Sequence, residues 1–268
     1  MKKVFIIIVL LIFCIFLYGK YIEINNFKIK EYIIQNENIP ESFKELKIVH
    51  FSDILYKEKD DNKIKDIITK INEQKADIVI FTGDLFNNNE KYSDNNYSKI
   101  KEHLTNINAT LFKFAVIGDN DEAFLEKYKD ILYESNFTIL DNSNKLVFYK
   151  DITPINIIGI TSLDNINELL ETDVDYNYSL AITHKPDYLE SLEKYNINTI
   201  LSGHSLGGII NIPFYGGLFT KNGSKKYVND YYKLNNTEIY ISNGIGSEKY
   251  EFRLFNTPSI NVYRFDNK

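Results

Sequence analysis

The sequence predicts an α/β fold, in which strands followed by helices build a layered sheet structure. Short apolar runs typical of buried strands alternate with segments whose apolar residues follow the spacing of one helix face, as in residues 64–71. At 268 residues the chain is long enough for one large or two small domains, and no internal repeat or low-complexity linker divides it. We therefore expect one α/β domain.

The composition is that of a globular protein and argues against a nucleic-acid partner. Hydrophobic residues make up 44% and charged residues 25% of the chain. The net charge is −6 and no basic stripe interrupts the mixed charges, so no specific nucleic acid is expected as a partner. Cys14 is the only cysteine, which excludes an intrachain disulfide.

The N-terminus predicts a membrane anchor over residues 1–22. Two lysines precede an unbroken apolar run of 15 residues, 4–18. As a helix this run would cover about 22 Å, less than the ~30 Å hydrocarbon core of a bilayer. Lys3 and Lys20 can extend towards the headgroups, and Tyr18 and Tyr21 suit the membrane interface.

Two alternatives to an uncleaved anchor stay open, a cleaved signal peptide and a buried core segment. The apolar part of a signal peptide has this length, but no small-x-small cleavage site follows, and bulky Phe13 precedes Cys14 where a lipoprotein signal needs a small residue. Lys2 and Lys3 favour a cytoplasmic N-terminus and thus an extracytoplasmic soluble domain. Three further lysines weaken that asymmetry, Lys20, Lys28 and Lys30.

Residues 23–45 mix polar and apolar side chains and are expected to form a connector, with the domain over 46–268. Apolar runs predict strands at 47–52, 77–82, 111–117, 137–140, 155–160, 179–183, 199–202, 238–242 and 259–264. Helical spacing of apolar residues predicts helices around 64–71, 100–107, 125–132 and 188–195, the third of them capped by Asp121.

Five potential metal ligands directly follow predicted strands: Asp53, Asp84, Asp119, His184 and His204. In open α/β sheets, ligands collect beyond the carboxyl ends of the strands. Carboxylates and imidazoles together suit a divalent transition metal. A single Asp in such a place is usually a cap or turn residue, but glycines beside these residues would let the backbone approach a ligand closely.

These blocks resemble the motifs of calcineurin-like metallophosphoesterases in order and approximate spacing. They are Phe51-Ser52-Asp53, Thr82-Gly83-Asp84, Gly118-Asp119-Asn120-Asp121, Thr183-His184-Lys185-Pro186-Asp187 and Ser202-Gly203-His204. Blocks at 140–142, 158–160, 241–246 and 253–258 resemble the membrane-anchored bacterial branch of that family. The resemblance covers about residues 45–265 and implies a two-sheet β-sandwich flanked by helices, with metals at one edge.

The resemblance implies that one of the family's two metal sites is retained. Its ligands correspond to Asp84, Asp119, His184 and His204, with Asp119 in place of an Asn. We expect one divalent ion there, Mn, Fe or Zn. Asp53 is expected to bind the same ion or to orient the attacking water.

The other metal site has lost its ligands, because Leu55 and Leu206 stand where the family has histidines. The family's leaving-group histidine corresponds to Asn120, which can donate a hydrogen bond but cannot supply a proton near neutral pH. His50 has the opposite strand parity to Asp53 and is expected to point away from the site.

The expected function is that of a membrane-anchored hydrolase of reduced or altered activity. It would cleave phosphoester or pyrophosphate bonds in a phosphorylated small molecule or a lipid-linked phosphate. The combined loss at Leu55, Asn120 and Leu206 leaves a second hypothesis open. In it the chain is a catalytically inactive pseudo-phosphoesterase that acts as a binding or scaffold protein at the membrane.

Overall fold

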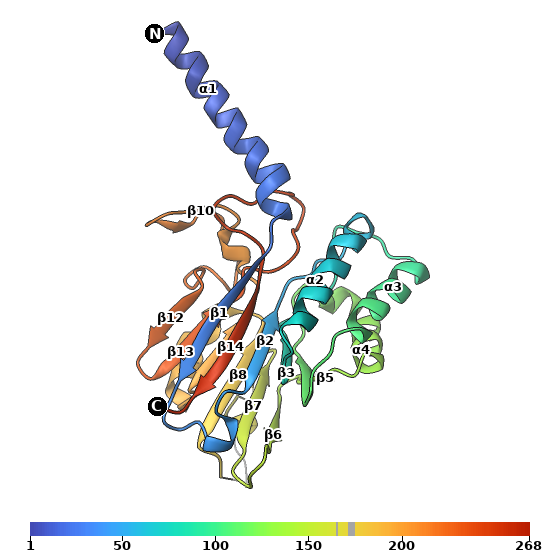
Figure 1. Cartoon of the computed structure of the whole chain (residues 1–268), viewed down its shortest axis with the longest axis vertical. Helices are drawn as coiled ribbons and strands as arrows, with labels where there is room; N and C mark the ends of the chain where they lie inside the picture. The colour runs from blue at the N-terminus through green and yellow to red at the C-terminus, as the bar shows by residue number, and fades with distance from the viewer. Residues whose placement is uncertain (165, 171–174) are drawn as a thin grey trace.

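Two six-stranded sheets pack face to face, with helices on their outer faces and a long N-terminal helix projecting from one end (Figure 1). The computed structural model describes residues 1–164, 166–170 and 175–268. The two-sheet sandwich that the resemblance implied is confirmed.

The first sheet has the order β1-β14-β2-β3-β4-β5. Its strands are β1 (Lys28–Gln35), β14 (Ser259–Asp266), β2 (Lys47–Phe51), β3 (Ile78–Phe81), β4 (Phe112–Ala115) and β5 (Thr138–Ile139). Strands β2 to β5 run parallel, so their carboxyl ends meet at one edge. The last strand of the chain, β14, runs parallel to β1 and antiparallel to β2.

The second sheet has the order β12-β13-β9-β8-β7-β6. Its strands are β12 (Tyr231–Leu234), β13 (Thr237–Ile241), β9 (Thr199–Ser202), β8 (Tyr178–Thr183), β7 (Ile155–Ile160) and β6 (Ser143–Val147). The four central strands are parallel. A separate small hairpin joins β10 (Asn211–Ile212) to β11 (Gly216–Gly217).

Three apolar layers hold the sheets and helices together. The helices are α2 (Asp61–Glu73), α3 (Asp94–Thr105), α4 (Leu125–Glu134), α5 (Ile166–Leu170) and α6 (Leu189–Leu192). Along β2, Val49 and Phe51 pack in the layer that contains α2, α3 and α4, whereas Ile48 packs between the sheets. Successive side chains of a strand point to opposite faces, so a strand buried on both faces is apolar throughout, which is why these runs were visible in the sequence.

The expected connector differs from the structure, because residues 28–35 within it form β1. This strand lies at the edge of the first sheet, and only Ile34 among its residues is buried. Charged residues interrupt its apolar ones, and Ile29 and Ile33 are exposed, so β1 lacks the continuous apolar run that marks the central strands.

The predicted cap at Asp121 is also wrong. Helix α4 begins at Leu125 and has no side-chain cap, while Asp121 begins a 3₁₀ turn four residues earlier. Its carboxylate is engaged at the metal centre described below.

The N-terminal helix α1 (Lys2–Leu17) continues through a π-turn (Tyr18–Ile22) into a short 3₁₀ turn (Glu23–Asn25). By length and composition alone, the helical stretch Lys2–Asn25 could cross a membrane, because it contains an 18-residue window with a mean hydropathy of 2.6. The domain holds only the base of this helix. The Phe16 ring stacks on Phe252 at 5.7 Å, and the Arg253 N–H donates to the Gly19 carbonyl at 3.2 Å.

Candidate metal centre

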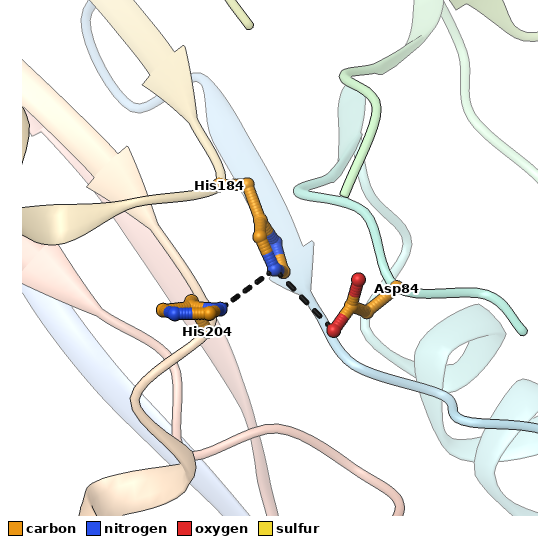
Figure 2. Close-up of side chains that lie close together, drawn as sticks. All are labelled: Asp84, His184 and His204. Atoms are coloured by element: carbon orange, nitrogen blue, oxygen red, sulfur yellow. Dashed lines mark hydrogen bonds and ion pairs between the residues drawn. The ribbon is translucent and has the colours of Figure 1, made fainter. Parts of the chain in front are cut away.

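Three of the five predicted ligands converge at the sheet edge: Asp84, His184 and His204 (Figure 2). One candidate ligand atom from each lies within 4.8 Å of the others, and all three side chains are buried. Asp84 follows β3 of the first sheet, whereas His184 and His204 follow β8 and β9 of the second. The carboxyl ends of strands from both sheets therefore build one centre.

Backbone carbonyls fix both imidazole rings. The Nδ1–H of His184 donates to the Thr82 carbonyl at 2.6 Å, and the Nε2–H of His204 donates to the Asn222 carbonyl at 2.7 Å. The two remaining nitrogens, Nε2 of His184 and Nδ1 of His204, face each other at 3.0 Å. A carbonyl partner on the outer nitrogen directs the lone pair of the inner nitrogen towards a metal.

Because both outer nitrogens carry the ring protons, the inner nitrogens, His184 Nε2 and His204 Nδ1, face each other with lone pairs and need a positive charge between them. Burial lowers the pKa of His184, but the Asp84 carboxylate outweighs burial and raises that pKa to about 9. Burial and then the charge on His184 lower the pKa of His204 to about 3. These opposite pKa shifts favour a proton on His184 over one on His204. Two imidazole nitrogens on one tetrahedral ion lie about 3.3 Å apart, so a divalent ion fits in place of this proton.

Asp53 borders the cluster and has one unsatisfied oxygen. Its Oδ2 accepts from the His204 backbone N–H at 3.0 Å, while its buried Oδ1 has no hydrogen-bond partner. Burial raises the pKa of this carboxyl group, and Asp84 raises it further. Gly203 makes the approach possible, since a Cβ there would collide with Ser52 Oγ and lie 2.8 Å from Asp53 Oδ2. An orphaned carboxylate oxygen suits a water or an ion.

Asp119 does not join the three converging residues. Its carboxylate pairs with Lys185 Nζ at 2.7 Å, and its side chain is 41% exposed. The physical reason lies in the residue type, because a carboxylate attracts the ammonium of the residue that follows His184. The neutral Asn that the family has at this position would not form this ion pair.

Asn120, the residue in the leaving-group position, lies against Asp84. Its backbone N–H donates to Asp84 Oδ1 at 2.8 Å, and its side-chain amide donates to Asp84 Oδ2 at 2.6 Å. Asn120 therefore orients the Asp84 carboxylate and lies beside the cluster.

Sequence reasoning missed Asp121 as a residue that shapes the centre. Its two carboxylate oxygens accept four backbone N–H groups, those of Asp84 at 2.8 Å, Leu85 at 2.8 Å, Phe86 at 3.2 Å and Gly118 at 3.0 Å. It thereby ties the turn after β3 to the turn after β4. Its place in the Gly-Asp-Asn-Asp block was the available signal.

Lys221 was missed as well, and no motif marks it. Its ammonium pairs with Glu248 at 2.6 Å, and its charge lowers the pKa of Asp53 and that of His204. It adds positive charge near the centre, where it acts on Asp53, Asp84 and His204.

Hydrocarbon fills the positions of the lost histidines. Leu55 and Leu206 are each 1% exposed, and both adopt a left-handed backbone conformation with φ of 47°. A Cβ on Gly244 would lie 2.7 Å from Leu206 Cδ2 and 2.9 Å from Asp53 Cβ, so these two side chains flank the same glycine. Leucine side chains cannot coordinate a cation, and the described residues offer no second cluster of ligands here.

Comparison with known proteins finds relatives among the phosphoesterases. Residues 46–208 match the calcineurin-like phosphoesterase family. The uncharacterized metallophosphoesterase YkuE of Bacillus subtilis is 30% identical over 255 residues, covering 92% of this chain and 88% of that protein. UDP-2,3-diacylglucosamine pyrophosphatase LpxG of Chlamydia muridarum is 24% identical, covering 82% and 83%. The crystal structure of TT1561 of Thermus thermophilus aligns with a TM-score of 0.48 at 12% identity, covering 75% of this chain and 90% of that one.

Proposed function

Because the chain belongs to the calcineurin-like phosphoesterase family, we propose that it is a membrane-anchored hydrolase that cleaves phosphoester or pyrophosphate bonds with one divalent ion. The observation that carries this proposal is the convergence of Asp84, His184 and His204, with both outer ring nitrogens fixed on carbonyls. With both outer nitrogens on carbonyls, the two inner nitrogens face each other at 3.0 Å, and a cation between them would satisfy both lone pairs.

The proposed ligands are Asp84, His184 and His204, with Asp53 as a further ligand or as the residue that orients water. Asp119 would become a ligand only after leaving Lys185. A divalent ion, Mn, Fe or Zn, supplies polarisation of a phosphoryl oxygen and acidifies a water.

The residues of the chain perform the remaining steps of hydrolysis. The free Oδ1 of Asp53 accepts a hydrogen bond from the attacking water and orients it. The water oxygen bonds to phosphorus, the P–O bond to the leaving group breaks, and the water proton passes to solvent. Lys185 and Lys221 would offset part of the negative charge of the phosphate.

Asn120 restricts which leaving groups can depart easily. An alkoxide needs a proton as it departs, and Asn120 cannot donate one, whereas a departing phosphate needs none near neutral pH. The chain therefore favours pyrophosphate bonds over simple phosphoesters. LpxG, the related UDP-2,3-diacylglucosamine pyrophosphatase, gives this preference a precedent among its relatives.

The anchor would be residues 1–22 and the catalytic unit residues 46–268, with the segment 23–45 between them contributing β1 to the sheet. The pair Lys2 and Lys3 supports an extracytoplasmic domain. A lipid-linked phosphate or another phosphorylated molecule near the membrane would then be the substrate.

The test uses the full-length chain in lipid vesicles with added Mn²⁺. We expect hydrolysis of a pyrophosphate diester, and slower hydrolysis of bis(p-nitrophenyl) phosphate. Asp84→Asn should abolish both activities, while His103→Gln, which changes a histidine bonded to Asp61, should leave them intact. No turnover by protein that has bound its ion would overturn the proposal.

A second candidate function is metal-dependent binding without hydrolysis. The two buried leucines, Leu55 and Leu206, and the non-acidic Asn120 favour it, because each removes part of the two-metal chemistry. Bound metal, absence of turnover and tight binding of a phosphorylated ligand that Asp84→Asn abolishes would together support this candidate.

A further inference from the structure

The β10–β11 hairpin presents apolar side chains to solvent. Phe214 at its tip is fully exposed, Tyr215 is 78% exposed and Phe219 is 56% exposed, and Ile212 and Leu218 are exposed beside them. Between residues 203 and 228 the sequence has no acidic residue and has three lysines. A cluster of this kind on a soluble surface indicates a contact with a partner or a membrane.

Backbone hydrogen bonds tie this hairpin to the base of α1. The Asn211 N–H donates to the Leu254 carbonyl at 2.9 Å, and the Leu254 N–H donates to Ile209 at 3.1 Å. The backbone N–H of the preceding residue, Arg253, donates to the Gly19 carbonyl at 3.2 Å. Figure 1 shows the hairpin next to the base of the long N-terminal helix.

The hairpin therefore lies at the level where α1 would leave the hydrocarbon core. Tyr18 ends the apolar run there, Lys20 and Tyr21 follow it, and such residues concentrate at membrane interfaces. Tyr250 and Phe255, in the loop that holds α1, are 70% and 58% exposed. Aromatic side chains from three segments of the chain thus gather around one end of the anchor.

We propose that the hairpin tip, residues 212–219, inserts into the interface of the same bilayer that α1 crosses. Five apolar side chains on one hairpin are far fewer than the roughly 20–30 residues a side of a stable protein interface. They suit a shallow wedge among lipids, and the lysines at 221, 225 and 226 suit anionic headgroups.

The hairpin also connects the membrane to the metal centre. It lies between His204 and Asn222, which are themselves joined by the 2.7 Å hydrogen bond from the His204 ring. Insertion of the tip would hold this side of the centre at headgroup depth. This inference rests on the proposed function. The substrates would be phosphates carried by membrane lipids, and the metal centre would reach them while the lipids stay in the bilayer.

The test measures depth with a fluorophore. In full-length Cys14→Ser protein, single cysteines at Phe214→Cys and Tyr215→Cys carry an environment-sensitive NBD label, in vesicles of phosphatidylethanolamine and phosphatidylglycerol. The control is Ile152→Cys, because Ile152 is 87% exposed and precedes β7, at the sheet edge opposite the metal centre.

We expect spin-labelled lipid to quench the labels at 214 and 215 several-fold more than the label at 152. Equal quenching at all three positions would overturn the proposal. So would blue-shifted labels at 214 and 215 that spin-labelled lipid does not quench, because a protein partner or a second copy would then cover the hairpin.

A second variant separates this inference from the proposed hydrolysis. Phe214→Ser/Phe219→Ser should slow hydrolysis of a vesicle-borne pyrophosphate lipid at least fivefold and leave hydrolysis of a soluble pyrophosphate unchanged. An equal effect on both substrates would count against the inference. The depth measurement needs no turnover, so a chain that inserts but does not hydrolyse would refute the proposed function alone.

Discussion

His184 Nε2 and His204 Nδ1 lie 3.0 Å apart, and each ring is held by its other nitrogen on a carbonyl of a different segment. The partner carbonyls belong to Thr82, beside Asp84, and to Asn222, beyond the β10–β11 hairpin. Neither ring can rotate away without losing a buried hydrogen bond. The pair is therefore preorganised for a cation, which leads to the first prediction.

Replacing either histidine should remove the bound ion. We expect purified full-length protein to hold about one divalent ion per chain, measured by elemental mass spectrometry. His184→Ala and His204→Ala should weaken binding by more than the roughly 10- to 100-fold that loss of an outer partner costs. The matched control, His103→Gln, should keep its ion, since His103 bonds Asp61 outside the cluster. Two ions per wild-type chain would contradict the single-site proposal.

Lys185 should limit metal affinity by holding Asp119. In Lys185→Gln, the Asp119 carboxylate loses its 2.7 Å ion pair and is free to bind the ion. We expect tighter Mn²⁺ binding by several-fold in a competition titration, with stability changed by less than about 1 kcal/mol because the pair is partly exposed. Asp119→Asn/Lys185→Gln should lose most of the gain. Unchanged affinity in the single variant would show that Asp119 is not a ligand.

Restoring both lost histidines should create a second metal site. Leu55→His/Leu206→His adds two imidazoles near Asp53 and Asp84, whose carboxylates remain. Without metal, the buried polar rings should lower the free energy of unfolding by about 1–3 kcal/mol, and saturating Mn²⁺ should recover this loss. Ion content should rise towards two per chain. A single ion in the double variant, with folding intact, would show that the lost metal site did not lie at Leu55 and Leu206.

His50 should make stability depend on pH between about 6.5 and 3. Its ring is buried between the sheets, with Nε2 2.9 Å from Thr82 Oγ1 and Nδ1 3.3 Å from the Tyr263 hydroxyl. Burial lowers its pKa to about 3. An unfolded imidazole has a pKa of about 6.5, so between these values the unfolded state binds the extra proton and stability falls as pH falls.

The contribution of His50 is fully present above pH 6.5, and its loss follows a slope of up to about 1.4 kcal/mol per pH unit. Urea unfolding of wild type and His50→Gln at pH 7, 6, 5 and 4 measures it. Carboxylates contribute alike to both proteins, so the wild type should lose stability more steeply. Parallel curves would show that the ring is already protonated in the folded state.

The sequence predicted the central strands because they are buried on both faces and therefore apolar without interruption. Helices α2, α3 and α4 were visible for a related reason, since one face of each packs on the first sheet. Strand β1 was missed because its own residues do not show a strand pattern. It forms because it pairs with β14, more than 220 residues later in the chain.

The centre was predictable wherever a motif fixed both residue type and position, as for Asp84, His184 and His204. It was not predictable where one side chain could bond to any of several neighbouring groups. Asp119 is paired with Lys185, the residue that follows His184, and Asp121 uses both oxygens on four backbone N–H groups instead of capping a helix. Which contact forms depends on the distances between segments in the folded chain, and these distances cannot be read from the spacing of residues in the sequence.

The pairing of β1 with β14 has a consequence for biosynthesis. Strand β1 directly follows the anchor, and its one neighbour in the sheet is the final strand of the chain, Ser259–Asp266. During translation the anchor emerges first, while β14 is still to be made. Strand β1 therefore stays unpaired until more than 220 further residues have been made, and the first sheet can close only once β14 has left the ribosome.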